Sequence, residues 1–214
     1  QLAAMLTAQC EGGFFTEAPM HFYGGTPLGY ACVFCLKRAV VTMLDTGLVS
    51  LDSDSARCTI SGLLPLHAVT ANRLMDMYNW LTDRRYPARP GEPLLKRHQL
   101  AEPRTVVAHA QLPQLGMAAC TPLQLAAQLG AKSAFIFLLH KQTHTLWKWG
   151  PVTAFEIDLR GVDSAGEGDV DVMEIIGRLD SQPETTSILL DDCMQGFVHK
   201  LFCQKWHRFG AAIH

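Results

Sequence analysis

A cysteine that follows a glycine-rich loop is the residue in this sequence best suited to nucleophilic chemistry. Gly24, Gly25 and Gly29 precede Cys32, and the apolar spacing beyond it predicts a helix over Cys32–Asp45. The positive end of a helix dipole lowers the pKa of a thiol at the helix N-terminus. Glycines in the loop let backbone amides approach an oxyanion. Cys32 is therefore a candidate nucleophile, with a small buried core residue as the alternative.

A nucleophilic cysteine needs a base, and the base needs a group that orients it. Strands expected at Thr145–Trp149 and Val152–Leu159 are joined by a Gly-Pro turn, so His144 and Asp158 fall beside each other across the hairpin. The carboxylate would fix the imidazole tautomer and stabilise the imidazolium. His144 is thus the candidate base and Asp158 the candidate orienting residue.

The order of these residues resembles that of papain-like and transglutaminase-like cysteine enzymes. The segments LGYAC, HTLWKW and FEID, which carry Cys32, His144 and Asp158, carry the resemblance. It implies a papain-like arrangement in which Cys32 attacks a carbonyl, His144 moves the proton and Asp158 orients the imidazole. The implied activity is that of a cysteine hydrolase or acyltransferase acting on a peptide or isopeptide bond of a protein or peptide substrate.

Other assignments of these roles stay open. Cys35 lies one helical turn after Cys32, and His109 and His140 are rival bases. The segment FEIDLRG also resembles the Asp-x-His segment of some ubiquitin-like-protein peptidases, but Arg160 stands where their histidine would be. On that alignment the protein would be an inactive relative of a peptidase.

Two cysteine-containing spacings allow a metal site in place of a catalytic one. Cys32 and Cys35 have the spacing of a zinc knuckle, and His199 and Cys203 lie one turn apart on a predicted helix. Together they would form the Cys3His ligand set of a structural zinc site. The bulky apolar residues between Cys32 and Cys35 disfavour a knuckle, so we expect no cofactor and keep zinc as the alternative.

Composition limits the class of protein. The chain has 214 residues, of which 48% are hydrophobic and 18% charged, which predicts a single globular domain over residues 1–214. A formal net charge of −2 gives no indication of nucleic-acid binding. The longest apolar run, Ala134–Leu139, is far shorter than the ~20 residues of a membrane span. Seven cysteines at irregular spacing favour a reducing intracellular compartment, the cytoplasm or nucleus.

The elements that must position these residues predict an α+β fold. N-terminal helices would pack on an antiparallel meander, and a C-terminal helix would close the domain. No internal repeat is apparent. We expect helices over Gln1–Gln9, Cys32–Asp45, Val69–Arg84, Pro122–Leu129, Val170–Leu179 and Asp192–Phe209, and strands at Thr105–Ala110, Ala134–Leu139, Thr145–Trp149, Val152–Leu159 and Thr186–Leu190.

An irregular, basic segment over residues 85–103 is the basis of a second functional hypothesis. Four prolines in and beside it block regular structure, and arginines and lysines make its neighbourhood basic. Long loops inside compact domains are often functional. The alternative to an enzyme is thus a non-catalytic interaction or assembly subunit, of viral or host origin, whose loop binds a protein partner.

Overall fold

The computed structural model describes residues 1–11, 25–108, 119–163, 171–172, 175, 197–205 and 207–208. The chain divides into two compact units, Gln1–Leu125 and Ala126–His214. We refer to them as the N-terminal and C-terminal units and describe each by itself. Among the described residues, no helix has the length and apolar character needed to cross a membrane.

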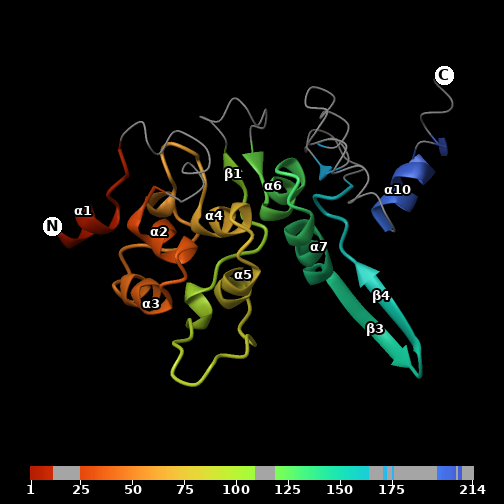
Figure 1. Cartoon of the computed structure of the whole chain (residues 1–214), viewed down its shortest axis with the longest axis horizontal. Helices are drawn as coiled ribbons and strands as arrows, with labels where there is room; N and C mark the ends of the chain where they lie inside the picture. The colour runs from red at the N-terminus through yellow and green to blue at the C-terminus, as the bar shows by residue number, and fades with distance from the viewer. Residues whose placement is uncertain are drawn as a thin grey trace. The chain divides into compact units, whose positions relative to one another are not determined.

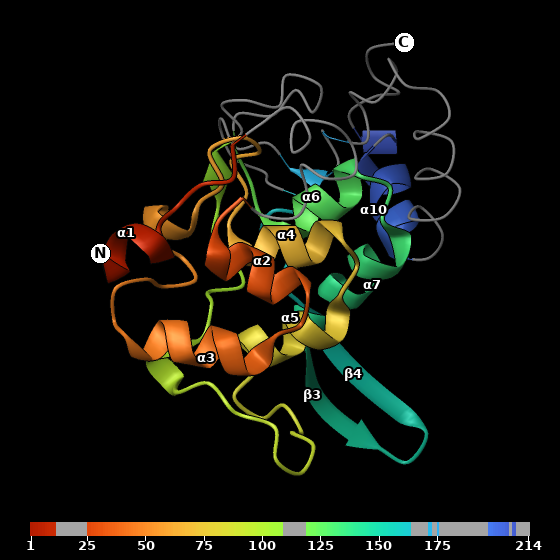
Figure 2. The ribbon, with the colours of Figure 1, turned by 60° about the vertical axis from the view of Figure 1, so that its left-hand side comes forward.

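The N-terminal unit is built mainly from short helices (Figures 1 and 2). α2 packs against α3 and α4, and α4 packs against α5. The elements are α1 (Leu2–Leu6), α2 (Pro27–Val33), α3 (Lys37–Asp45), the 3-10 helix η3 (Asp54–Ala56), α4 (Pro65–Ala71), α5 (Met75–Thr82), the 3-10 helix η4 (Arg97–Gln99), the paired strands β1 (Val107–Ala108) and β2 (Ala119–Cys120), and α6 (Pro122–Gln128), which runs past the end of the unit.

One type of turn occurs after α2, α4 and α6. Cys35, Arg73 and Gly130 occupy equivalent positions in these turns, with φ angles of 56°, 59° and 61°. In each turn the next backbone N–H bonds a carbonyl five residues earlier, as from Leu36 to Ala31 at 2.8 Å. The turns lead into α3, α5 and α7, so the helices form three helix–turn–helix pairs.

The first helix of each pair also opens in the same way. The openings are Thr26-Pro27-Leu28, Leu64-Pro65-Leu66 and Thr121-Pro122-Leu123, with proline in the first turn, where its missing N–H costs nothing. Each leucine is almost fully buried. The expectation of no internal repeat is therefore wrong. The sequence does not reveal the repeat as a fixed period, because the interval between the first two openings is much shorter than that between the second and third.

Two long helices expected from the sequence are each divided in two. Cys32–Asp45 was expected to be continuous, but α2 ends at Val33 and α3 begins at Lys37. Val69–Arg84 is divided in the same way, by the turn around Arg73. The apolar spacing continues through both turns, so periodicity alone does not reveal them.

The C-terminal unit contains helix α7 (Lys132–Lys141), strands β3 (Thr143–Trp149) and β4 (Val152–Ile157), and helix α10 (Phe197–Lys205). The two strands form an antiparallel hairpin that extends away from α7 (Figure 1). The strand expected at 134–139 lies within α7, because a short apolar run fits a buried helix as well as a strand. The elements expected at 186–190 and over most of 170–179 fall outside the described residues.

Helices combined with antiparallel strand pairs agree with the predicted α+β class at the coarse level. The described strands form two separate two-stranded sheets, β1–β2 and β3–β4, rather than one meander. The hairpin and α6 are confirmed close to their expected bounds, and α10 falls within the expected closing helix. The finer, papain-like arrangement stays a prediction.

Candidate interaction surfaces

Cys32 does not lie at the start of a helix. It occupies the last turn of α2 (Pro27–Val33), and its side chain is fully buried. Burial raises the pKa of the Cys32 thiol far above its ordinary value, and the neighbouring Cys35 raises it further. The helix that carries Cys32 already begins at Pro27, where Thr26 caps it. The expected lowering of the Cys32 pKa by the helix dipole is therefore wrong.

His144 lies on the hairpin of the C-terminal unit and Asp158 directly follows its second strand, whereas Cys32 belongs to the N-terminal unit. A register shift between Thr145 and Trp147 places Glu156 opposite His144, one residue before the expected residue 157. The carboxylate of Asp158 accepts hydrogen bonds from its near neighbour Arg160, at 3.1 Å from Nε and 2.8 Å from a terminal nitrogen. The pKa of Arg160 is raised by this hydrogen bond and by the charge of Asp158.

The rival bases and the alternative zinc ligands belong to several different elements. Of the rival bases, His140 is exposed near the end of α7, and His109 lies outside the described residues. Cys203 Sγ lies 3.5 Å from His199 Nε2, which confirms that these two side chains share a face of α10. Cys35, their proposed co-ligand, lies in the N-terminal unit. Within the described ranges, no group of three or more histidine, cysteine or carboxylate side chains could hold a metal ion.

The basic loop between α5 and η4 is attached to the helices by a partly buried lysine. Lys37, the first residue of α3, bonds the carboxylate of Glu92 in the loop, and both side chains are mostly covered. The Lys37 ammonium also lies 5.4 Å from the ring centroid of Trp80 and 4.8 Å from that of Tyr86. A cation at a helix N-terminus opposes the helix dipole. We therefore attribute its position to these loop contacts. Bonding to Lys37 lowers the pKa of Glu92.

Further contacts fasten the loop along its length. Trp80 Nε1 donates to the carbonyl of Pro93 at 2.9 Å. Asp45, at the end of α3, accepts hydrogen bonds from Lys96 at 2.7 Å and from Gln99 at 2.9 Å. These two bonds lower the pKa of the Asp45 carboxyl, with that from Lys96 having the larger effect. The loop is thus held by side chains from α3 and α5.

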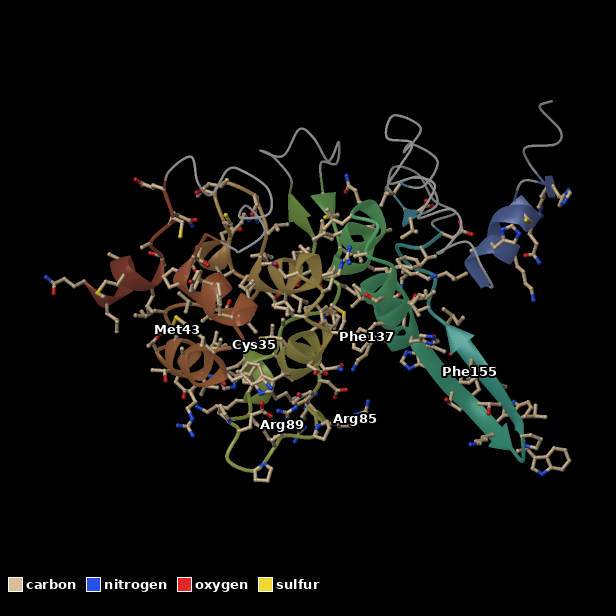
Figure 3. The ribbon with its side chains drawn as sticks, in the orientation of Figure 1. Cys35, Met43, Arg85, Arg89, Phe137 and Phe155 are labelled. Carbon is tan, nitrogen blue, oxygen red and sulfur yellow. The ribbon has the colours of Figure 1, made fainter. Side chains whose placement is uncertain are left out.

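The basic loop, held in place by these contacts, exposes arginine side chains to solvent. Arg84, Arg85, Arg89 and Arg97 are all exposed, and Figure 3 shows Arg85 and Arg89 on the loop. The side chain of Arg85 is 92% exposed. Lys37 and Lys96 bond carboxylates, and Arg85 Nε lies 3.7 Å from the carboxylate of Asp83, an ion pair that is weak at so exposed an arginine. The exposed arginines therefore give this loop surface its positive charge. This loop surface is the first candidate interaction surface.

The hairpin forms the second candidate surface. Trp149 is 79% exposed, and Trp147, Val152 and Phe155 are each more than half exposed. Trp147 and Trp149 lie on one face of the hairpin with Val152, because Trp149 pairs with Val152 and side chains alternate along a strand. Phe155 is visible on β4 in Figure 3. A cluster of large apolar side chains exposed to solvent is typical of a protein–protein contact site.

Comparisons with known proteins give relatives of one kind, although no protein-family model matches the chain. Transient receptor potential cation channel subfamily V member 6 of Homo sapiens is 27% identical over 209 residues, which are 97% of this chain and 24% of that protein. Subfamily V member 5 of Homo sapiens is also 27% identical over 209 residues, and that of Oryctolagus cuniculus is 25% identical over 211 residues. The chain spans about a quarter of the length of these relatives.

The cysteine-hydrolase function predicted from the sequence is wrong in the light of these relatives. Along 97% of its length the chain is similar to proteins named as cation channels. The alternative hypothesis, a non-catalytic interaction subunit, agrees better with this similarity. Sequence reasoning identified the basic loop but missed Lys37, because its partner Glu92 is 55 residues away in the chain.

Proposed function

We propose that this chain is an interaction and assembly region of a polypeptide related to the subfamily V cation channels. The similarity to human members 6 and 5 over 97% of the chain carries the proposal. In this proposal the region has no catalytic role and contributes no part of the pore. It holds other parts of the channel, or its partners, in position, on the reducing side of the membrane.

The helix pairs support an interaction role. A T-P-L opening followed by two helices is the pattern of the ankyrin repeat, and TPLGYA and TPLQLA follow it closely. The intermediate repeat opens with LPLHAV and keeps the histidine of that pattern as His67. Stacked repeats bury a shared core and leave long surfaces for partners. We therefore assign the α2–α3, α4–α5 and α6–α7 pairs to an ankyrin-type array.

His67 illustrates how one repeat is connected to the next. Its side chain is fully buried, and Nε2 lies 3.1 Å from the carbonyl oxygen of Cys120, just before α6. A carbonyl can only accept, so Nε2 carries the proton and donates. The bond therefore joins α4 to the segment that opens the third pair.

The hairpin is the surface that we assign to channel assembly. Its exposed tryptophans would lose their contact with water on binding, and burial of apolar area is the main driving force for association. Tryptophan is also enriched among the residues that contribute most to protein interfaces. The Arg85–Arg89 part of the basic loop is assigned to an acidic partner, because its arginines are exposed and give it a positive charge.

The first test is the reading frame of the source transcript beyond the codon for His214. The proposal expects the frame to continue into several apolar segments of about 20 residues, the length that spans a bilayer. A stop codon that ends the frame before any such segment would refute the proposal.

The second test addresses the hairpin in the full-length polypeptide. Changing both Trp147 and Trp149 to serine is expected to abolish cation current and co-purification of two differently tagged copies. Lys148→Ala, between them on the other face, is the matched control and is expected to behave as wild type. Circular dichroism of the double variant checks that it folds. A folded double variant with normal current and co-purification would contradict the assignment.

A further inference from the structure

Cys10 and Cys58 lie on either side of Gly25 in the N-terminal unit. A Cβ atom placed on Gly25 would lie 2.8 Å from the Sγ of Cys58 and 3.8 Å from the Cβ of Cys10. The Cys58 sulfur and the Cys10 Cβ are therefore no farther apart than these two distances added together. Gly25 does not have a positive φ. Glycine is needed here for the space beside the Cys58 sulfur, and not for backbone freedom.

Hydrogen bonds hold Cys10 at this place. Its backbone N–H donates to the carbonyl of Gly25 at 2.6 Å. The side chain of the preceding residue, Gln9, donates through Nε2 to the carbonyl of Arg57 at 2.8 Å and accepts from the N–H of Thr59 at 3.1 Å. The Gln9 amide thus bonds the residues on both sides of Cys58, so hydrogen bonds hold the segment that carries Cys10 against the segment that carries Cys58.

The two thiols differ in their access to solvent. Both are free, Cys58 is buried and Cys10 is partly exposed. Burial raises the pKa of the Cys10 thiol, and the neighbouring Cys58 raises it further, which agrees with their closeness. An external oxidant therefore reaches Cys10 first, and the reaction is faster at alkaline pH because the thiolate is the attacking species.

We propose that Cys10 and Cys58 are a redox modification site that forms a reversible disulfide with glutathione disulfide as oxidant. The Cys10 thiolate attacks one glutathione sulfur, which forms a mixed disulfide and releases one glutathione thiolate. The Cys58 thiolate then attacks the Cys10 sulfur and releases the second glutathione. The protein loses two electrons and two protons, and one glutathione disulfide becomes two glutathione molecules. The bond would tie the segment after α1 to the loop after η3.

The test is disulfide mapping of the whole chain after equilibration with glutathione buffers of increasing oxidising strength. After blocking free thiols, digestion with trypsin and a glutamate-specific protease cuts after Glu11, Lys37 and Arg57. Cys10 and Cys58 then lie in different peptides, and neither peptide contains Cys32 or Cys35. We expect a cross-linked peptide pair containing Cys10 and Cys58, a loss of two of the seven titratable thiols, and reversal by a reductant.

Matched variants separate this site from the exposed thiol of Cys35. Cys35→Ser is expected to leave the cross-link intact, whereas Cys10→Ser removes it. Cys10→Ser is also expected to abolish the rise in melting temperature that oxidation gives the wild type. The proposal is overturned if Cys10 is recovered only as a glutathione mixed disulfide at the oxidising limit, or if Cys58 pairs with another cysteine. Neither readout depends on the role of the chain in a channel.

Discussion

The hydroxyl of Thr26 is expected to contribute to stability through two bonds at once. Thr26 is only 1% exposed and caps α2. Its Oγ1 accepts a hydrogen bond from the N–H of Gly29 at 3.1 Å and donates to the carbonyl of Ala56 at 3.2 Å. Thr26→Val keeps the shape of the side chain and removes both bonds, so no cavity complicates the result.

The size of the effect follows from these two losses. Removing an N-cap side chain costs about 1 kcal/mol. Leaving a buried carbonyl without its donor costs about 1–3 kcal/mol. We therefore expect Thr26→Val to lower the free energy of unfolding of the N-terminal unit by about 2–4 kcal/mol. Thr26→Ser, which keeps the hydroxyl, is expected to lose less.

Urea unfolding of the whole chain measures this difference, with the product of midpoint and slope giving the free energy. The fluorescence of Trp80, which is 1% exposed, reports on the N-terminal unit, and circular dichroism at 222 nm reports on all helices. Thr7→Val is the matched control, because the Thr7 hydroxyl donates to the carbonyl of Ala3 at an exposed site. The control should stay within about 0.5 kcal/mol of wild type. A Thr26→Val value equally close to wild type would refute the reasoning.

Three further predictions concern the basic loop, the repeated turns and the buried histidine. The pKa values of Asp45 and Glu92 are lowered in the folded protein. Their contribution to stability is therefore complete at neutral pH and is lost as pH falls below the ordinary carboxyl values and through the lowered folded values. Trp80 emission should shift in this acid range, and should not shift when both acids are replaced by amides. Gly130→Ala should cost about 1 kcal/mol at a φ of 61°, measured by urea unfolding, and an unchanged midpoint would contradict it. His67→Ala should cost about 2–4 kcal/mol, because it opens a cavity and leaves the Cys120 carbonyl without its donor; a loss below 1 kcal/mol in the same assay would count against that bond.

Local signals in the sequence were sufficient to predict some of the elements. The helix expected over Pro122–Leu129 begins at a capping box whose partners lie within one turn. The Thr121 N–H donates to Gln124 Oε1 at 2.8 Å, and the Gln124 N–H donates to Thr121 Oγ1 at 3.3 Å. The hairpin was predictable for the same reason, since alternation and a Gly-Pro turn are local. The residue directly opposite His144 was not, because one extra residue between Thr145 and Trp147 shifts the pairing by one, from 157 to Glu156.

Features that depend on distant parts of the chain were not predictable in this way. The sequence predicts that a helix begins at Cys32, because the glycines around Thr26 and Pro27 favour a loop there. The basic loop was expected from composition, but its attachment to Lys37 requires two residues 55 positions apart to meet. The repeat was not predictable either, because its three openings follow one another at unequal intervals along the chain. The position with positive φ in the three turns is a cysteine, an arginine and a glycine, so no residue type marks the turn.

The short turns within the helix pairs also set the order in which the chain can fold during synthesis. α2 and α3 are separated by three residues, Phe34 to Leu36, so this pair is complete as soon as Asp45 has emerged from the ribosome. Contacts between neighbours in sequence form early, because little loop entropy is lost in making them. A translation product that stops between pairs should therefore retain structure, whereas one that stops within a pair exposes an apolar helix face that invites aggregation or degradation.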